Sequence, residues 1–164
     1  MVYLEPERLG WRPLVQSWLN SIEYLTSLTK EYINNLFEIF VESALTFVRG
    51  SCKELSPTTD IGLVNSLIRL LDSTFDNFRR CGIPEDNEAH ELTEQRIQCR
   101  FLFCMAWSIG GSIATPSQLK FDHMVRQRIQ EMQLPLKLEL PIEGTLFRLW
   151  RQFYKKNRRM GSLD

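Results

Sequence analysis

The chain has 164 residues, of which 43% are hydrophobic, and it carries four Trp and ten Phe. That length fits one domain of ordinary size, and so much apolar material argues against a chain that is disordered over most of its length. Twenty basic residues balance twenty acidic ones, so the chain as a whole has no electrostatic preference for nucleic acid, anionic membranes or acidic substrates.

Cysteine spacing and apolar runs bear on the compartment in which the chain works. The cysteines match neither a metal knuckle nor a redox pair, so we expect reduced, mostly buried thiols at Cys52, Cys81, Cys99 and Cys104. Residues 1–14 are too charged for a signal peptide. The longest apolar run, residues 101–107, is far shorter than the roughly 20 residues of a membrane-spanning helix. We therefore expect a cytoplasmic protein without a membrane span.

Apolar residues recur at helical spacing along most of the chain, which predicts an all-α fold. A first helix is expected to open at Arg12 and Pro13, because proline suits the first helical turn. Its inward residues are Leu14, Trp18 and Leu19. A second helix is expected to run from a cap at Thr29 to Gly50. Its apolar stripe consists of Ile33, Leu36, Phe37, Phe40, Val41, Ala44, Leu45 and Val48.

A loop and cap over residues 57–60 precede the third predicted helix, which is expected to continue to Gly82. Its inward residues repeat at helical spacing: Ile61, Val64, Leu67, Ile68, Leu71, Phe75 and Phe78. The polar segment 82–90 contains a proline and predicts an exposed loop.

A fourth helix is expected from about Glu91, until the glycine pair at positions 110 and 111 ends it. Its residues 101–107 are apolar all round, as in a helix at the centre of a bundle. Thr115 and Pro116 then predict the cap and first turn of a fifth helix. The inward residues of that helix are Leu119, Phe121, Val125, Ile129 and Met132.

The helical pattern breaks after residue 132. Pro135 and Pro141 favour an extended connector over a packed strand. We therefore divide the chain into a helical domain, residues 1–132, and a connector with a basic amphipathic tail, residues 133–164.

The tail contains a last amphipathic stretch, residues 146–154. The tail carries six basic residues and no acid between Glu143 and Asp164. They are Arg148, Arg151, Lys155, Lys156, Arg158 and Arg159. Its apolar face is formed by Leu146, Phe147, Trp150, Phe153 and Tyr154. Such a helix either docks its aromatic face on the bundle while its charges are solvated, or binds an anionic membrane, RNA or a calmodulin-like protein partner.

Motifs for catalysis or for a bound cofactor are not found in the sequence. The eight glycines do not form a P-loop, and a glycine pair after a helix indicates a helix stop rather than a phosphate cradle. His90 and His123 lack partners at metal or triad spacing and are expected on the surface. Asp72 and Asp76 are expected on a solvated helix face rather than at a metal. We therefore predict no catalytic, cofactor-binding or metal-ligating residue.

Three long segments carry a more specific pattern: MVYLEPERLGWRPLVQSWLN at residues 1–20, CKELSPTTDIGLVNSLIRLL at residues 52–71, and residues 101–121 around WSIGGS. They resemble, in this order, the entry to the small subdomain, the lid helix and the final helix pair of the second AAA+ module of dynein heavy chains. The resemblance covers roughly residues 1–132 and is closer to axonemal than to cytoplasmic dyneins. It implies a bundle of five to six helices that closes over ATP or ADP with magnesium held by a neighbouring α/β subdomain.

One position of the lid helix departs from the family. In the hydrolytic first module the equivalent helix resembles Asp-x-Gly-Leu-Arg, whose arginine reaches the terminal phosphate, whereas residues 60–64 here are DIGLV. Val64 neither donates a hydrogen bond nor neutralises charge in phosphoryl transfer, and Arg69 points about 140° away around the helix. Because it also lacks a P-loop and a Walker B segment, the chain alone is not expected to be an enzyme.

Two functions remain open. The first is a non-catalytic lid fragment of an ATP-driven microtubule motor in the ciliary axoneme. Its partners would be neighbouring AAA+ subdomains of the same heavy chain, with microtubules reached only through the whole motor. Met1 falls at a position that is internal in the family, which favours a fragment. The second is an independent helical module that binds an anionic or protein partner through its basic tail, with no nucleic-acid partner expected.

Overall fold

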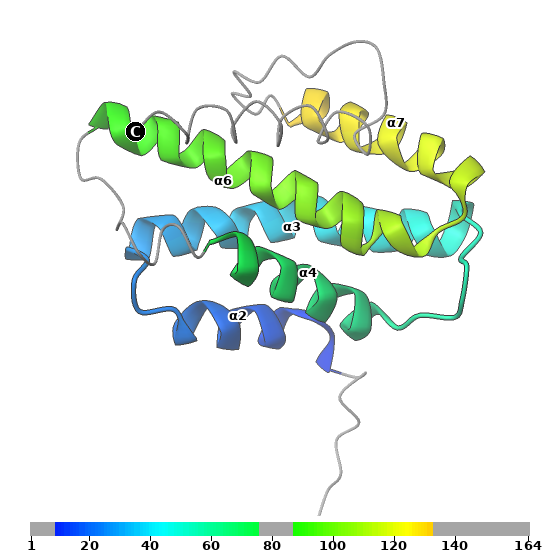
Figure 1. Ribbon diagram of the computed structural model, residues 1–164, viewed down its shortest axis with the longest axis horizontal. Helices are drawn as coiled ribbons and strands as arrows, with labels where there is room; N and C mark the ends of the chain where they lie inside the picture. The colour runs from blue at the N-terminus through cyan, green and yellow to red at the C-terminus, as the bar shows by residue number, and fades with distance from the viewer. Residues whose placement is uncertain (1–8, 76–86, 133–164) are drawn as a thin grey trace, which may run out of the picture.

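A computed structural model describes residues 9–75 and 87–132, with side chains from Glu94 onward in the second range (Figure 1). Within these ranges the chain is helical apart from short connections and one isolated antiparallel bridge between Glu54 and Ile113. The all-α prediction is confirmed. The elements, in chain order, are α2 (Arg12–Ser21), α3 (Ser27–Ser51), α4 (Asp60–Thr74), α6 (Asn87–Ser108), the short 3₁₀ helix η1 (Gly110–Ser112) and α7 (Thr115–Glu131).

The long helices α3 and α6 cross the middle of the bundle. Helix α3 packs against α2, α6 and α7, and α4 packs against α2 and α6. Figure 1 accordingly shows α2 and α4 on one side of this central pair and α7 on the other. Aromatic rings fill the crossing point of α2, α3 and α6: the centroids of Phe37 and Phe101 lie 5.1 Å apart, and those of Trp18 and Phe37 lie 6.1 Å apart.

Helix α2 begins at Arg12 as predicted, with proline in its first turn and the buried Trp11 at its N-cap. Leu19 is buried, and Leu14 and Trp18 are partly buried against the core, so the predicted inward face is confirmed. The pattern missed Val15, which is almost fully buried.

Helix α3 confirms its predicted stripe, since all eight residues from Ile33 to Val48 that were expected to face inward are buried. The predicted cap at Thr29 is wrong. The side chain of Thr26 caps the helix by accepting a hydrogen bond from the Thr29 amide at 3.3 Å, so the helix starts almost one turn earlier. At the other end it passes Gly50 and stops at Ser51.

The cap of helix α4 lies within the predicted segment 57–60, because Thr59 Oγ1 accepts from the Gly62 amide at 3.1 Å. The prediction that the helix continues to Gly82 is wrong, since it ends at Thr74. The hydroxyls of Ser73 and Thr74 donate to backbone carbonyls three residues back, and such local bonds compete with further helix growth. Phe78 and the remainder of the predicted helix lie outside the described residues.

Helix α6 begins at Asn87, so the predicted loop over residues 82–90 in fact contains the first turn of this helix. The rest of that loop lies outside the described ranges. The helix ends at Ser108, just before the glycine pair of η1, as predicted. Residues 101–107 are mostly buried, but Trp107 is 49% exposed. The helix thus keeps an outer face where Trp107 packs on Phe103, one turn earlier, with ring centroids 6.4 Å apart.

Helix α7 corrects three predictions. Thr115 is its first helical residue, whereas the N-cap is Ala114, which makes no side-chain cap bond. Leu119 is 62% exposed and Met132 is 40% exposed, although both were predicted to face inward. The helix buries the row Phe121, Val125 and Ile129. Leu119 lies about 200° around the helix from Phe121, and Met132 follows the last helical residue.

The cysteines within the described ranges are free thiols, as expected: Cys104 is buried, and Cys52 and Cys99 are partly buried. Cys81 and the whole connector and tail, residues 133–164, lie outside the described residues. Along the described ranges no helix combines the length and the apolar character needed to cross a bilayer.

Candidate functional site

Two loops are fastened together at one end of the bundle. The α3–α4 loop and the α6–α7 loop exchange backbone hydrogen bonds, from the Leu55 amide to the Ser112 carbonyl at 2.9 Å and from the Ala114 amide to the Lys53 carbonyl at 2.8 Å. The Lys53 amide also donates to the Ser117 hydroxyl at 3.1 Å. These bonds fix the end of α3 relative to η1 and the beginning of α7.

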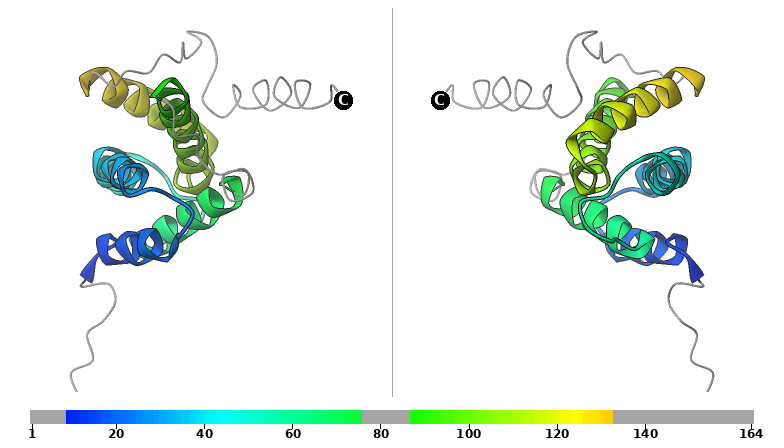
Figure 2. Two further views of the ribbon diagram at one scale, coloured as in Figure 1. Left: turned by 90° about the vertical axis from the view of Figure 1, so that its left-hand side faces the viewer. Right: turned by 90° about the vertical axis from the view of Figure 1, so that its right-hand side faces the viewer.

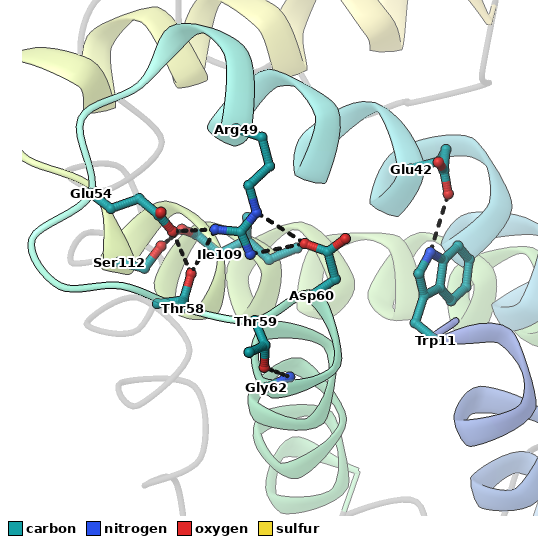
Figure 3. Close-up of polar contacts among 10 residues, drawn as sticks. All are labelled: Trp11, Glu42, Arg49, Glu54, Thr58, Thr59, Asp60, Gly62, Ile109 and Ser112. Carbon is teal, nitrogen blue, oxygen red and sulfur yellow. Dashed lines mark hydrogen bonds and ion pairs between the residues drawn. The ribbon is translucent and has the colours of Figure 1, made fainter. Parts of the chain in front are cut away.

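A polar group beside this junction, which we call the Arg49 cluster, consists of Arg49, Glu54, Thr58 and Asp60 (Figure 3). Arg49 Nη1 lies 2.6 Å from Glu54 Oε1 and 3.0 Å from Thr58 Oγ1. Its Nη2 and Nε donate to Asp60 Oδ1 at 2.8 and 3.1 Å. The Thr58 hydroxyl in turn donates to Glu54. One guanidinium on the last turns of α3 thus holds the loop and the first residue of α4.

The electrostatics of the Arg49 cluster favour the charged guanidinium. Partial burial opposes the charge, but hydrogen bonds and charges from Asp60 and Glu54 outweigh it and raise the pKa of Arg49 above its ordinary value. Two carboxylates therefore already neutralise this cation. It is committed to closing the loop and is a poor candidate for binding an external phosphate.

An open hollow of about 400 Å³ lies next to the Arg49 cluster and is lined by Gly10, Trp11, Arg49, Thr58, Thr59, Asp60 and Ile61. One wall is formed where the chain enters the bundle. Gly10 has a φ of 69°, in the left-handed region that glycine adopts readily. This turn delivers Trp11 into the core, where its Nε1–H donates to Glu42 Oε2 at 3.2 Å (Figure 3).

The entry wall is held from outside as well. The guanidinium of Arg12 lies 4.6 Å from the ring centroid of Trp11 and pairs with Glu38 on α3 at 3.0 Å. The hollow is therefore bounded by two fixed segments, the entry turn on one side and the beginning of α4 on the other. Such a concave surface is suited to receive a side chain or a loop from a neighbouring domain.

Position 64, where the resemblance expects an arginine in hydrolytic modules, does not line the hollow. Val64 is fully buried on the inner stripe of α4 together with Leu67 and Leu71. Arg69 lies on the exposed side of the same helix. In this chain, position 64 contributes to the core.

Two of the four residues for which sequence reasoning weighed a chemical role have described side chains. His123 and Asp72 are exposed, where they were expected, while His90 and Asp76 fall outside the described side chains. Within the described ranges, no group of three or more His, Cys, Asp or Glu side chains is placed to hold a metal ion. Burial raises the pKa of Cys104 to about 12, so this thiol stays protonated at neutral pH and is a poor nucleophile.

Sequence reasoning missed the Arg49 cluster. Its members are 5, 9 and 11 residues from Arg49, but α3 ends at Ser51 and α4 begins at Asp60, so no single helix relates them. The available signal was an arginine at a helix end followed by two acids in the next loop and cap. That signal becomes specific only when the loop path is known.

Comparison with known proteins gives a consistent result. A family profile described as the dynein heavy chain AAA lid domain matches residues 33–157. Human dynein axonemal heavy chain 1 is 34% identical over 149 residues, 90% of this chain. Human dynein axonemal heavy chain 6 is 34% identical over 159 residues, 95% of this chain. Human dynein axonemal heavy chain 3 is 36% identical over 137 residues, 80% of this chain.

The chain is much shorter than these relatives. The chain spans only 3% of the length of the first of these relatives and 4% of the second. The family profile reaches residue 157, well beyond residue 132, up to which the resemblance was followed from the sequence. Similarity thus extends through the connector and into the basic tail.

Proposed function

The chain belongs to the dynein heavy chain AAA lid family, and we propose that it is a non-catalytic lid fragment of an axonemal-type, ATP-driven microtubule motor. In the parent protein, a neighbouring α/β subdomain would hold ATP or ADP with magnesium, and the lid would dock on that subdomain. The cytoskeleton of the cilium is the place of action that this proposal implies.

The observation that carries the non-catalytic assignment is the position of Val64. A lid contributes to phosphoryl transfer when it extends a cation toward the terminal phosphate. Here the corresponding side chain is apolar and fully buried in the core. Arg49, the cation that lines the hollow, is paired with Glu54 and Asp60. Both features support a lid that positions and transmits without assisting hydrolysis.

The fastened loops support a mechanical role. Because hydrogen bonds join the α3–α4 and α6–α7 loops, and Trp11 ties the entry segment to α3, the bundle resists internal deformation. A displacement applied at the entry turn is then passed on as rotation of the whole bundle rather than absorbed by one loop. We propose the hollow beside Gly10 as the surface that meets the neighbouring subdomain.

The first test measures ATP turnover by the purified 164-residue chain with magnesium. We expect no hydrolysis above the buffer background. Turnover that saturates with ATP and elutes together with the chain on size exclusion would contradict the non-catalytic assignment.

The second test measures binding of the chain to the large subdomain of the second AAA+ module from an axonemal dynein. We expect Ile61→Glu, in the hollow, to weaken this binding at least tenfold, whereas Leu28→Glu, at the far end of α3, should leave it unchanged. Equal binding by both variants would show that the hollow is not the docking surface.

A further inference from the structure

An apolar groove runs between α3 and α7, which lie on the same side of the bundle (Figure 2). It has a volume of about 680 Å³ and is lined by Phe47, Ser51, Leu119, Lys120, His123, Met124 and Gln127. Phe47 and Met124 are partly buried, and the 62% exposed Leu119 projects beside them. Single exposed apolar residues are common on protein surfaces, but apolar side chains gathered along one groove indicate a contact site.

The spacing of the lining residues suits an added helix. Leu119, His123 and Gln127 follow one another at intervals of four residues on α7, and Phe47 and Ser51 do so on α3. Rows at this spacing are the ridges between which the side chains of a third helix insert. An amphipathic helix placed in such a groove is a recurrent mode of peptide recognition.

The groove is held open by contacts at both of its ends. At one end, Ser117 on α7 accepts a hydrogen bond from the Lys53 amide at 3.1 Å. At the other end, Arg128 Nε donates to the Ile39 carbonyl of α3 at 3.2 Å. Because α7 is pinned to α3 and its loop in this way, a partner need not reorganise the surface, which lowers the cost of binding.

The charge of the groove is one-sided. Among the described residues that line it, Lys120 is cationic and none is Asp or Glu. We propose that the α3–α7 groove docks an amphipathic α-helix of a protein partner, whose apolar ridge is flanked by carboxylates. The ridge would cover Leu119, Met124 and Phe47 while its carboxylates approach Lys120. This interaction goes beyond a lid role, because the groove lies apart from the hollow beside Gly10.

The test uses the full 164-residue chain and two labelled helical probe peptides, measured by fluorescence anisotropy. Both peptides carry a leucine ridge, flanked by glutamates in one and by lysines in the other. We expect saturable binding of the glutamate peptide, at least tenfold tighter than that of the lysine peptide. Equal binding of the two peptides, or no binding of the glutamate peptide up to millimolar concentration, would overturn the proposal.

Variants locate the binding site. Leu119→Ser should weaken binding of the glutamate peptide about tenfold, and Lys120→Glu should weaken it about fivefold and improve binding of the lysine peptide. Leu28→Ser is the matched control, because Leu28 is 68% exposed but lines neither the α3–α7 groove nor the hollow beside Gly10, and it should bind like the unchanged chain. Circular dichroism confirms that each variant is folded.

Other occupants have distinct signatures. Dimerisation that Leu119→Ser abolishes would overturn the proposal in favour of a second copy. Tighter peptide binding after deletion of residues 145–164 would overturn the proposal and show that the chain's own tail occupies the groove. Binding to anionic vesicles that Leu119→Ser abolishes would overturn the proposal and show that the groove contacts a membrane. A monomeric chain, with peptide affinity unchanged by the deletion and no Leu119-dependent vesicle binding, supports the protein partner.

Discussion

The Arg49 cluster and the α3–α7 groove both include residues on the last turns of α3. They differ in whether their side chains find partners within the chain. Arg49 finds carboxylate and hydroxyl partners within the chain. Phe47 and Ser51, two residues to either side, face a groove whose apolar side chains remain accessible. The contrast separates surface that maintains the fold from surface that is available to a partner.

This difference predicts opposite consequences of mutation. A change in or beneath the Arg49 cluster removes contacts made within the folded chain, so it should lower the free energy of unfolding. A change in the groove removes contacts that form only with a partner, so it should alter association and leave stability nearly unchanged. The following variants test that division, starting with the largest expected effect on stability.

Val64→Arg should have the largest effect. Val64 is fully buried in the helix that begins at the cluster, and an unpaired guanidinium there would cost about 4 kcal/mol or prevent folding. Urea unfolding followed by circular dichroism measures the loss. Ser66→Arg, at an exposed position of the same helix, is the control and should change stability by less than about 0.5 kcal/mol. If both variants were equally stable, position 64 would be open to solvent and the argument from its burial would fail.

Arg49→Leu should have the second-largest effect. The change removes hydrogen bonds to Glu54 and Asp60 and leaves two carboxylates near each other without their shared cation. Hydrogen bonds to charged groups are worth roughly 1.5 to 3 kcal/mol, but partial exposure weakens them, so we expect a loss of about 2 kcal/mol. Arg69→Leu, on the exposed side of α4, is the matched control and should be nearly neutral. If Arg49→Leu and Arg69→Leu lowered the free energy of unfolding equally, the Arg49 cluster would have no special role in stability.

The cap of α4 offers a coupled test on the cluster side. A Cβ atom at Gly62 would lie 2.9 Å from Thr59 Oγ1, the atom that caps the helix. Gly62→Ala gains about 1 kcal/mol of helix propensity and loses about 1 kcal/mol of capping, so alone it should be near neutral. With Thr59→Ala already in place, the same change should stabilise by about 1 kcal/mol. Equal effects in both backgrounds would show that the two residues do not interact.

The regular parts of the fold were predictable from the sequence because burial on one face imposes a helical period. The eight-residue stripe of α3 is the clearest case. Errors arose where the same local signal allows two outcomes. Thr26 and Thr29 are three residues apart, and either hydroxyl is chemically able to cap a helix. The structure shows that Thr26 does so, by accepting a hydrogen bond from the Thr29 amide.

The candidate site was less predictable than the fold. The Arg49 cluster depends on how the loop after α3 folds back, which no residue spacing in the sequence specifies. The groove was hidden for a different reason. An apolar residue on a helix indicates burial but does not say whether the chain itself or a partner supplies the cover. Leu119 was therefore predicted to face inward, whereas the structure turns it outward.

Leu119→Ser should leave stability nearly unchanged and is the sharpest test of the groove side. Leu119 is 62% exposed, so its replacement should change the free energy of unfolding by less than about 0.5 kcal/mol. It should nevertheless reduce binding of the hydrophobic dye ANS, because it removes the most exposed apolar side chain of the groove. Leu28→Ser, at a slightly more exposed position outside the groove, should leave dye binding unchanged. If Leu119→Ser instead destabilised the chain by about 2 kcal/mol or more, Leu119 would belong to the core, and the distinction between the groove and the Arg49 cluster would disappear.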